Sequence, residues 1–307
     1  MELCHYSPQT LEIDEVIFSR ALLAFSPHGE LLVTGCEDGM VRIWEPTNPT
    51  PLRRIAAQQG AVKSVAWSPN GKFIASGGDD GTIKLWDRSG QIHLTLGRHD
   101  QSIRVVQFSP DGQVLASAGD DHTVRIWDPS KANTYVTLDN AGWVWDLCFA
   151  PDSRTLATGS FDSKLMLWDV AAHSQKMSFK DNADAIMAVA NAPDGKTIVT
   201  GDILHRMRLW DAATGRERGS IQAHSFPVVA VAFAPSGQLI ASASWGQSFF
   251  IGAEAKLWDG QTLQLLSVLK GHKGGLTCLS FAPDGKSLAT GSCDATVMVW
   301  DVHGVRK

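Results

Sequence analysis

The chain has 307 residues, of which 44% are hydrophobic and 19% charged, and its formal net charge is −5. This apolar content excludes an intrinsically disordered chain, and the scattered Lys and Arg residues of a mildly acidic protein give no general attraction for nucleic acid. The longest apolar candidate, residues 226–233, is far shorter than the roughly 18–20 residues of a membrane helix. Residues 1–16 carry four acids and no Lys or Arg, unlike a secretory signal, so we expect a cytoplasmic protein that binds neither nucleic acid nor membrane.

Five cysteines are spread along the chain: Cys4, Cys36, Cys148, Cys278 and Cys293. None belongs to a CxxC pair, and no His stands at metal-ligand spacing from them. We therefore expect single thiols in a reducing compartment, with no metal site and no cofactor.

In chain order, one pattern recurs seven times: an apolar residue, any residue, an apolar residue, Trp and an acid. Its tryptophans are 42, 41, 41, 42, 48 and 42 residues apart. A period of this length indicates a propeller or another repeat architecture. The tryptophans are Trp44, Trp86, Trp127, Trp168, Trp210, Trp258 and Trp300.

The unit from His99 to Asn140 shows how each repeat is built. Its alternating residues 103–108 lead into Ser-Pro-Asp-Gly, a tight turn between antiparallel strands. Residues 114–118, 123–127 and 134–138 supply three further strands. Four short strands cannot bury both of their faces alone, so successive units must pack on one another.

The seven motif copies resemble the WD-repeat β-propeller family, whose blades are four-stranded antiparallel sheets around a central channel. The resemblance covers about residues 10–301. It implies an all-β, seven-bladed propeller that forms a single domain over residues 1–307. The repeat tryptophans are then core residues, because burying an indole removes on the order of 150–250 Å² from water; stacking on a ligand is the remote alternative.

The start of the chain is expected to close the ring. After the last motif only six residues remain, too few for a fourth strand in the seventh blade. We therefore expect Thr10–Asp14 to supply that strand, with Leu11 and Ile13 at the positions that Leu94 and Leu96 hold in the second repeat. Pairing the two ends would remove exposed sheet edges.

Two repeats carry His, Ser or Thr, Asp and Trp at fixed offsets. Composition alone allows a hydrolase triad, but Ser117 lies inside a predicted strand, without the exposed oxygen that a nucleophile needs. The family resemblance implies a buried hydrogen-bond network instead, and buried polar groups need such partners. The two sets are His99, Ser117, Asp121 and Trp127 in repeat three, and His272, Thr290, Asp294 and Trp300 in repeat seven.

The same positions vary in the other repeats, which predicts a less rigid arc over repeats four to six. Repeat six keeps the imidazole as His224, but the Asp position becomes Leu204 in repeat five and is lost in repeat six. The His position is Val16, Gln58, Asn140 and Asn182 in repeats one, two, four and five.

The loop before the first strand of each blade and the turn between its second and third strands share one end of the propeller, the top rim. One residue per blade should line the channel mouth there: Ala21, Lys63, Arg104, Trp145, Met187, Val229 and Thr277. Neighbouring positions divide this rim into two arcs. Lys63, Arg104, Glu37, Asp79 and Asp120 form a charged arc, and Trp143, Trp145, Phe161, Met187 and Ile203 form an apolar arc.

Two interpretations stay open for the aromatic residues of the top rim. Trp143 and Trp145 either plug a cavity between blades or anchor a binding surface, where exposed aromatics and Arg concentrate. The turn between the second and third strands of blade six carries six extra residues and contains Trp245, Phe249 and Phe250. These side chains either fold back on blades five and six or extend the apolar arc.

We expect a non-enzymatic scaffold that presents its top face to a protein or peptide partner, as a monomeric propeller within a complex. Two alternatives remain: a sensor or regulatory subunit that binds a small ligand at the channel mouth, and a catalytic propeller. The mouth offers one Lys and one Arg but no His or acid, which disfavours catalysis. The expected partner-binding residues are Lys63, Arg104, Trp143, Trp145, Phe161, Met187, Trp245, Phe249 and Phe250.

Overall fold

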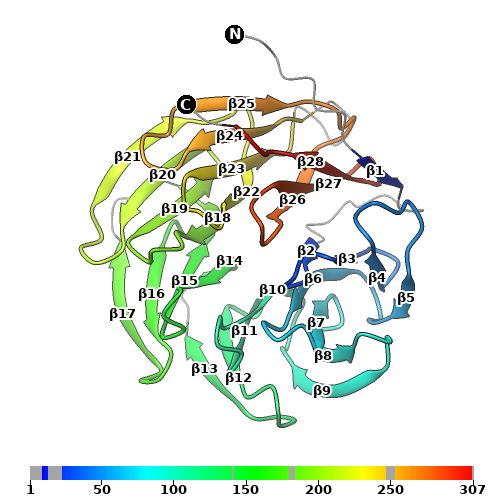
Figure 1. Cartoon of the computed structure of the whole chain (residues 1–307). Helices are drawn as coiled ribbons and strands as arrows, with labels where there is room; N and C mark the ends of the chain where they lie inside the picture. The colour runs from blue at the N-terminus through cyan, green and yellow to red at the C-terminus, as the bar shows by residue number, and fades with distance from the viewer. Residues whose placement is uncertain (1–8, 13–22, 140–141, 180–183, 247–252, 306–307) are drawn as a thin grey trace.

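The structure is a computed structural model, and it describes residues 9–12, 23–139, 142–179, 184–246 and 253–305. These residues form seven four-stranded antiparallel sheets arranged as a ring (Figure 1). The secondary structure assigned within the described ranges is strand and turn, and none of it is a helix able to cross a membrane. The predicted all-β, seven-bladed propeller is confirmed.

Blades one to six each use four consecutive strands, in chain order from the channel outwards. Blade one holds β2 (Leu23–Phe25), β3 (Leu32–Gly35), β4 (Met40–Trp44) and β5 (Arg53–Ala56). Blade two holds β6 (Val62–Trp67), β7 (Phe73–Gly78), β8 (Thr82–Asp87) and β9 (Ile92–Arg98). Blade three holds β10 (Ile103–Phe108), β11 (Leu115–Gly119), β12 (Thr123–Trp127) and β13 (Tyr135–Asp139).

The second half of the ring repeats this order. Blade four holds β14 (Val144–Phe149), β15 (Thr155–Ser160), β16 (Leu165–Asp169) and β17 (Ser174–Phe179). Blade five holds β18 (Ile186–Asn191), β19 (Thr197–Asp202), β20 (Arg206–Asp211) and β21 (Glu217–Gln222). Blade six holds β22 (Val228–Phe233), β23 (Leu239–Ser244), β24 (Ala255–Asp259) and β25 (Leu265–Leu269). Blade seven holds β26 (Leu276–Phe281), β27 (Ser287–Ser292), β28 (Thr296–Asp301) and β1 (Gln9–Glu12).

The Ser-Pro-Asp-Gly turns join the two inner strands as the sequence predicts. In blade three, Gly112 has φ +70° and donates its N–H to the carbonyl of Ser109 at 2.8 Å. The Asp111 carboxylate accepts hydrogen bonds from the Ser109 hydroxyl at 2.6 Å and from the N–H of Gln113 at 3.0 Å. Glycine adopts this backbone conformation without a steric penalty, so the strands can reverse tightly.

The N-terminal strand closes the ring, as predicted, but in a different register. Leu11 lies opposite Val297 in β28 and is 1% exposed, the place that the buried Leu138 holds in blade three. In blade two Leu96 holds this buried place. The sequence predicted that Ile13, two residues after Leu11, would be its equivalent in blade seven. A slip of two residues keeps the same side chains facing inwards, so hydrophobic alternation could not detect the error. Ile13 lies outside the described residues.

The hydrophobic core consists of seven clusters, and each lies between two neighbouring blades. The repeat tryptophans are between 0% and 6% exposed. Every one of them donates its indole N–H to a Ser or Thr hydroxyl of the second strand, at 2.7–3.0 Å. These indoles therefore fasten the third strand to the second while filling the space between blades.

Candidate protein-binding surface

In six of the seven described inner strands a β-bulge near the top rim leaves one residue outside the ladder. In blade three the register shifts between Ile103 and Val105, which leaves Arg104 outside the ladder. The same shift occurs in blades two, four, five, six and seven. A bulge re-aims the side chain of its extra residue, and the side chains of Lys63 and Arg104 each reach an acid of the rim. The bulged residues are Lys63, Arg104, Trp145, Met187, Val229 and Thr277.

In blades two, three and four the bulged residue contacts the residue that precedes the turn acid. In blade two, Lys63 Nζ lies 3.5 Å from the Asp79 carboxylate. In blade three, Arg104 donates two hydrogen bonds to Asp120, Nε to Oδ1 at 2.6 Å and Nη2 to Oδ2 at 3.1 Å. Blade four replaces this ion pair with two aromatic rings. The charged arc and the apolar arc are therefore the same structural position filled with different side chains.

Three aromatic residues and Arg104 form one contiguous group, which we call the aromatic–arginine cluster: Arg104, Trp143, Trp145 and Phe161. The Phe161 ring lies 5.7 Å from the ring of Trp143 and 6.4 Å from that of Trp145. The guanidinium of Arg104 stacks over Trp145 at 4.7 Å, across the boundary between blades three and four. Asp120 holds the other side of that guanidinium, so its position is fixed by a carboxylate and an aromatic face together.

The backbone holds the two outer rings of this cluster at the surface. The N–H of Phe161 donates to the carbonyl of Trp143 at 2.8 Å. The corresponding bond occurs in five other blades, at 2.9–3.0 Å in four of them and at 3.4 Å in blade six. Trp143 is 44% exposed and Phe161 is 45% exposed, whereas Trp145 is partly buried. Trp143 therefore does not plug a cavity between blades, and Trp145 packs between the surface and the neighbouring blade.

Three of the residues predicted to line the channel mouth are buried in the structure. Met187 is 2% exposed and belongs to the core, although the sequence analysis assigned it to the apolar arc. Val229 and Thr277, at the same position in blades six and seven, are also buried. At this position the long side chains of Lys63 and Arg104 keep their charged ends in water. Met187, Val229 and Thr277 have no charged end, so they can be buried against the neighbouring blade.

The insertion of blade six is only partly described. Trp245 is partly buried, and Ala253 is 5% exposed. Glu254 forms an ion pair of 2.9 Å with Lys270, which ties the end of the insertion to the loop after β25. Phe249 and Phe250 lie outside the described residues, so their predicted part in binding stays a prediction.

One further residue, not predicted as a binding residue from the sequence, adds an apolar side chain to the top rim. Leu204 replaces the turn acid of blade five and is 50% exposed. Its signal was present in the sequence, since a leucine at a turn position that elsewhere holds Asp has no structural need to be there.

The buried networks of repeats three and seven are present as predicted. In repeat three, Trp127 Nε1 donates to Ser117 Oγ at 2.7 Å, and that oxygen lies 2.6 Å from His99 Nε2. His99 Nδ1 lies 2.9 Å from Asp121 Oδ2. Ser117 is 0% exposed, so no substrate can reach its hydroxyl in this fold. In repeat seven, Trp300, Thr290 and His272 repeat the chain at 2.8 and 2.7 Å, and His272 Nδ1 lies 3.4 Å from Asp294.

Burial and hydrogen bonding together set the pKa values of the acids and imidazoles in these networks. Burial alone would raise the pKa of Asp121, but hydrogen bonds from His99 and Thr123 and the charge of His99 outweigh it and hold that pKa well below its usual range. The pKa of Asp294 is lowered in the same way, against burial, by His272 and Thr296. In repeat six no acid replaces the lost Asp, and burial lowers the pKa of His224 to about 3. The neutral imidazole of His224 still meets Ser242 at 2.7 Å.

A family model described as "WD domain, G-beta repeat" matches seven segments that together cover most of the chain. The segments are residues 21–45, 49–87, 90–128, 133–169, 173–211, 215–251 and 263–301. The chain belongs to the WD-repeat family. WD-repeat propellers commonly serve as protein-interaction scaffolds and are generally not enzymes. A search of curated proteins found none similar to this chain.

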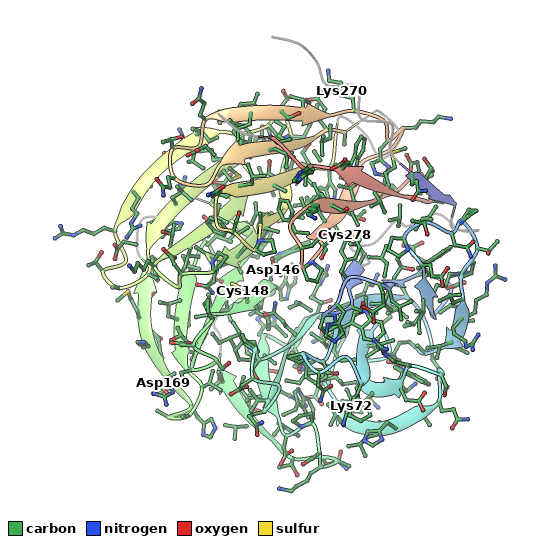
Figure 2. The ribbon with its side chains drawn as sticks, in the orientation of Figure 1. Lys72, Asp146, Cys148, Asp169, Lys270 and Cys278 are labelled. Carbon is green, nitrogen blue, oxygen red and sulfur yellow. The ribbon has the colours of Figure 1, made fainter. Side chains whose placement is uncertain are left out.

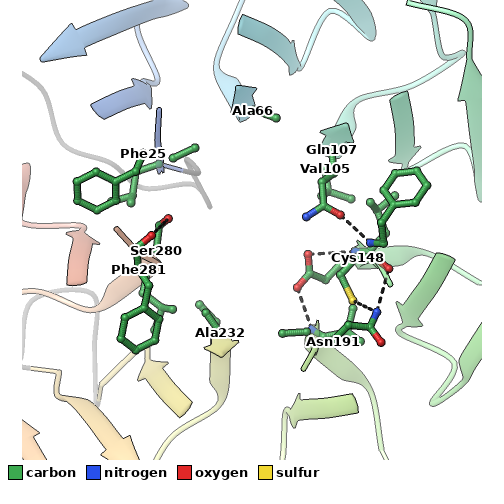
Figure 3. Close-up of a pocket in the computed structure, with 18 of the residues that line it drawn as sticks. Phe25, Ala66, Val105, Gln107, Cys148, Asn191, Ala232, Ser280 and Phe281 are labelled. Atoms are coloured by element: carbon green, nitrogen blue, oxygen red, sulfur yellow. Dashed lines mark hydrogen bonds between the residues drawn. The ribbon is translucent and has the colours of Figure 1, made fainter. Parts of the chain in front are cut away.

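The channel of this WD-repeat propeller has a polar side and an apolar side around a cavity of about 510 Å³ (Figure 3). On the polar side, side chains bond to the main chain of a neighbouring blade. Gln107 Oε1 accepts from the N–H of Phe149 at 2.8 Å, and Asp146 Oδ2 accepts from the N–H of Val189 at 2.9 Å. Phe25 and Phe281 lie on the opposite side.

These channel residues act between blades, and the sequence analysis did not find them. Figure 2 shows Asp146 and Cys148 near the centre of the ring, with Asp169 and Lys270 at its periphery. Among the described residues, no group of three His, Cys, Asp or Glu side chains is placed to hold a metal ion.

Proposed function

We propose that this WD-repeat chain is a non-enzymatic interaction scaffold, a monomeric propeller that holds a protein or peptide partner on its top face at the aromatic–arginine cluster. The main support for this proposal is that the large rings of Trp143 and Phe161 are almost half exposed and contact each other. Contiguous exposed aromatic surface is unusual on a soluble protein and is typical of a binding site.

The repeat itself supplies an internal comparison that supports the proposal. The Trp143 position is Ala61, Ser102, Ala185, Pro227 or Gly275 in the other described blades. Those blades fold with small residues there, so the fold does not require an indole at this place. The fold does not require an indole here, and exposing an indole to water is unfavourable. A binding partner that covers Trp143 best explains its presence.

The chemistry around the rings also fits an interface. Arg104 and Asp120 neutralise each other beside Trp145, and Lys63 and Asp79 do so one blade further along. The rim therefore offers an apolar centre bordered by paired charges that can orient a partner without leaving an unmatched charge.

The test is affinity capture from a native lysate of the source cells, using the wild-type protein and the Trp143→Ala variant. We expect the variant to lose its specific partner, because removing a central aromatic anchor costs at least about 2 kcal/mol of binding free energy. The matched control is Ile92→Ala, because Ile92 is 54% exposed but lies on the outer strand β9. Equal capture by wild type and Trp143→Ala, with loss in Ile92→Ala, would move the site to the outer strands.

A further inference from the structure

The last residue of each inner strand lies at the junction between its own blade and the preceding one. Where this residue is aromatic, we call it an aromatic wedge. Six of the seven blades carry an aromatic residue there, and blade five carries Asn191. The aromatic wedges are Phe25, Trp67, Phe108, Phe149, Phe233 and Phe281, and each belongs to the core cluster at its junction or packs against it.

The wedge between blades three and four shows where such a ring lies. Phe149 clusters with Ile126 from the third strand of blade three and with Leu156 from the second strand of blade four. One junction further on, the equivalent residues are Leu167 and Ile198, which belong to the same cluster as each other. At this junction no aromatic ring is available from the end of β18, because Asn191 stands there.

A cavity of about 580 Å³ lies at this junction, and its lining includes Leu167, Ile198 and Asn191. The Asn191 amide is turned to the neighbouring blade, where Nδ2 donates to Cys148 Sγ at 3.1 Å and to the Cys148 carbonyl at 3.4 Å (Figure 3). The equivalent cavity between blades three and four, where Phe149 is present, has only about 310 Å³ and is not lined by the wedge residue. The cavity between blades four and five is therefore the larger one, and it includes the space beside Asn191. Its volume is within the range of about 300–1,000 Å³ that small-molecule sites occupy.

The rim of this cavity carries both signs of charge. Lys176 and Lys196 are exposed cations, and Lys176 Nζ donates to Thr155 Oγ1 at 3.3 Å. Asp152 and Asp194 are exposed acids on the two facing turns.

The third basic residue of the rim already has a partner. Arg218 also lines the cavity, and its Nη2 donates to Asp211 Oδ2 at 2.5 Å, while its Nη1 donates to Thr197 Oγ1 at 2.8 Å. Lys176, Lys196, Asp152 and Asp194 are the other charged groups of the rim. Asp152 also accepts hydrogen bonds from the N–H groups of Arg154 and Thr155, and Asp194 accepts one from the N–H of Lys196.

We propose that this cavity between blades four and five binds a free aromatic amino acid. Its ring takes the place that the aromatic wedges fill at the other six junctions, between Leu167 and Ile198. Its carboxylate lies towards Lys176 and Lys196, and its ammonium group lies towards Asp152 and Asp194. A rim with both signs of charge complements a zwitterion better than it complements a simple acid or amine.

The first experiment measures binding of L-phenylalanine and L-tryptophan to the intact protein by calorimetry and saturation-transfer NMR. Phenylacetate and phenethylamine are the comparison probes, because each keeps the ring but lacks one of the two charges. We expect each to bind at least about tenfold more weakly, since a hydrogen bond to a charged group contributes roughly 1.5–3 kcal/mol. Equal binding of phenylacetate or phenethylamine and phenylalanine would overturn the assignment to an amino acid, as would no binding of any aromatic probe.

The decisive variant is Asn191→Phe, which gives this junction the wedge of the other six. We expect binding to be abolished while the melting temperature stays at or above that of the wild type, because the ring fills the cavity. A second variant, Ala213→Trp, covers the exposed rim without changing the core and is expected to block binding as well. Undiminished binding in both variants would overturn the proposal.

The matched control is a lysine at the equivalent position of another blade. Lys286 holds in blade seven the turn position that Lys196 holds in blade five. We expect Lys196→Ala to weaken binding of phenylalanine several-fold and Lys286→Ala to leave it unchanged. Equal effects of the two substitutions would show that the rim lysine does not contact the carboxylate. Because none of these positions belongs to the aromatic–arginine cluster, a failure here leaves the scaffold proposal unaffected.

Discussion

Single residues of the same repeat position take different roles along this ring. The acid that completes the buried network is Asp121 in blade three and Asp294 in blade seven, while blade five holds an exposed leucine there. In blade five an acid appears two residues earlier. Asp202 is buried with its carboxylate 3.5 Å from Nη1 of Arg208, and burial raises the pKa of Asp202. Arg208 therefore has a buried carboxylate partner in blade five, although the turn acid is replaced by leucine there.

The Asp121→Ala variant tests the structural role of the network in blade three. It leaves the buried imidazole of His99 without its carboxylate partner, which costs about 1–3 kcal/mol of unfolding free energy. Urea unfolding of the variant and the wild type measures this difference. Asp100→Ala is the control, because the Asp100 side chain is 87% exposed and its loss is expected to change stability by less than about 0.5 kcal/mol. Equal stability of Asp121→Ala and the wild type would contradict the network.

His224 makes the free energy of unfolding depend on pH. Its pKa is about 3 in the folded protein and near 6.5 in the unfolded chain. Between these values the unfolded state binds a proton that the folded state does not, so stability falls as the pH is lowered through this window. From about pH 7.5 to about pH 5 this one group accounts for a loss of about 2 kcal/mol. Urea unfolding at both pH values is expected to show a smaller loss in His224→Gln; an identical loss would contradict the burial of a neutral imidazole.

At the scale of elements, the repeat motif predicted most of the strands because each strand has its own signal. The Trp-acid end marks the third strand, and the Pro-Asp-Gly turn separates the first two. The register of β1 was wrong by two residues because only an alternating pattern, without a motif, was available. The contacts of Gln107 and Asp146 with neighbouring blades could not be predicted, since they depend on which backbone groups face each other across a junction.

The N-terminal strand is expected to contribute stability to the whole ring. Deleting residues 1–12 leaves β28 as an open edge with unpaired backbone groups and exposes the core around Leu11. We expect a lower melting temperature and aggregation, measured by calorimetry and light scattering. Deleting residues 1–8 alone keeps β1 and is expected to leave both unchanged. If the longer deletion also left the melting temperature unchanged, closure by β1 would contribute nothing to stability.

At the scale of the whole molecule, the ring is closed but not uniform. Complete His–Asp networks occur in blades three and seven, whereas blade five has Leu204 and blade six has an imidazole without an acid. We expect amide hydrogen exchange in the inner strands β14, β18 and β22 to be faster than in β10 and β26, because local opening follows local stability. Equal protection in all five strands would show that the junction clusters alone set the rigidity of a blade.

The candidate surface also depends on the whole ring. The repeat register placed Trp143, Trp145 and Phe161 on one rim from sequence alone, and the structure brings them into contact with Arg104 of the preceding blade. The exposure of each residue could not be predicted, as the buried Met187 shows, because it depends on packing against the neighbouring blade. The function proposed for this surface therefore rests on the exposure and contacts of these side chains as well as on their repeat position.

Oxidative footprinting of the protein with and without its captured partner tests the central proposal most directly. Hydroxyl radicals modify exposed aromatic and aliphatic side chains, so the reactivity of a residue reports whether a partner covers it. We expect the partner to protect Trp143 and Phe161 from oxidation, while Ile92 on β9 and Leu265 on β25 react as they do in the free protein. Unchanged reactivity of Trp143 and Phe161, with protection at Ile92 or Leu265, would contradict it.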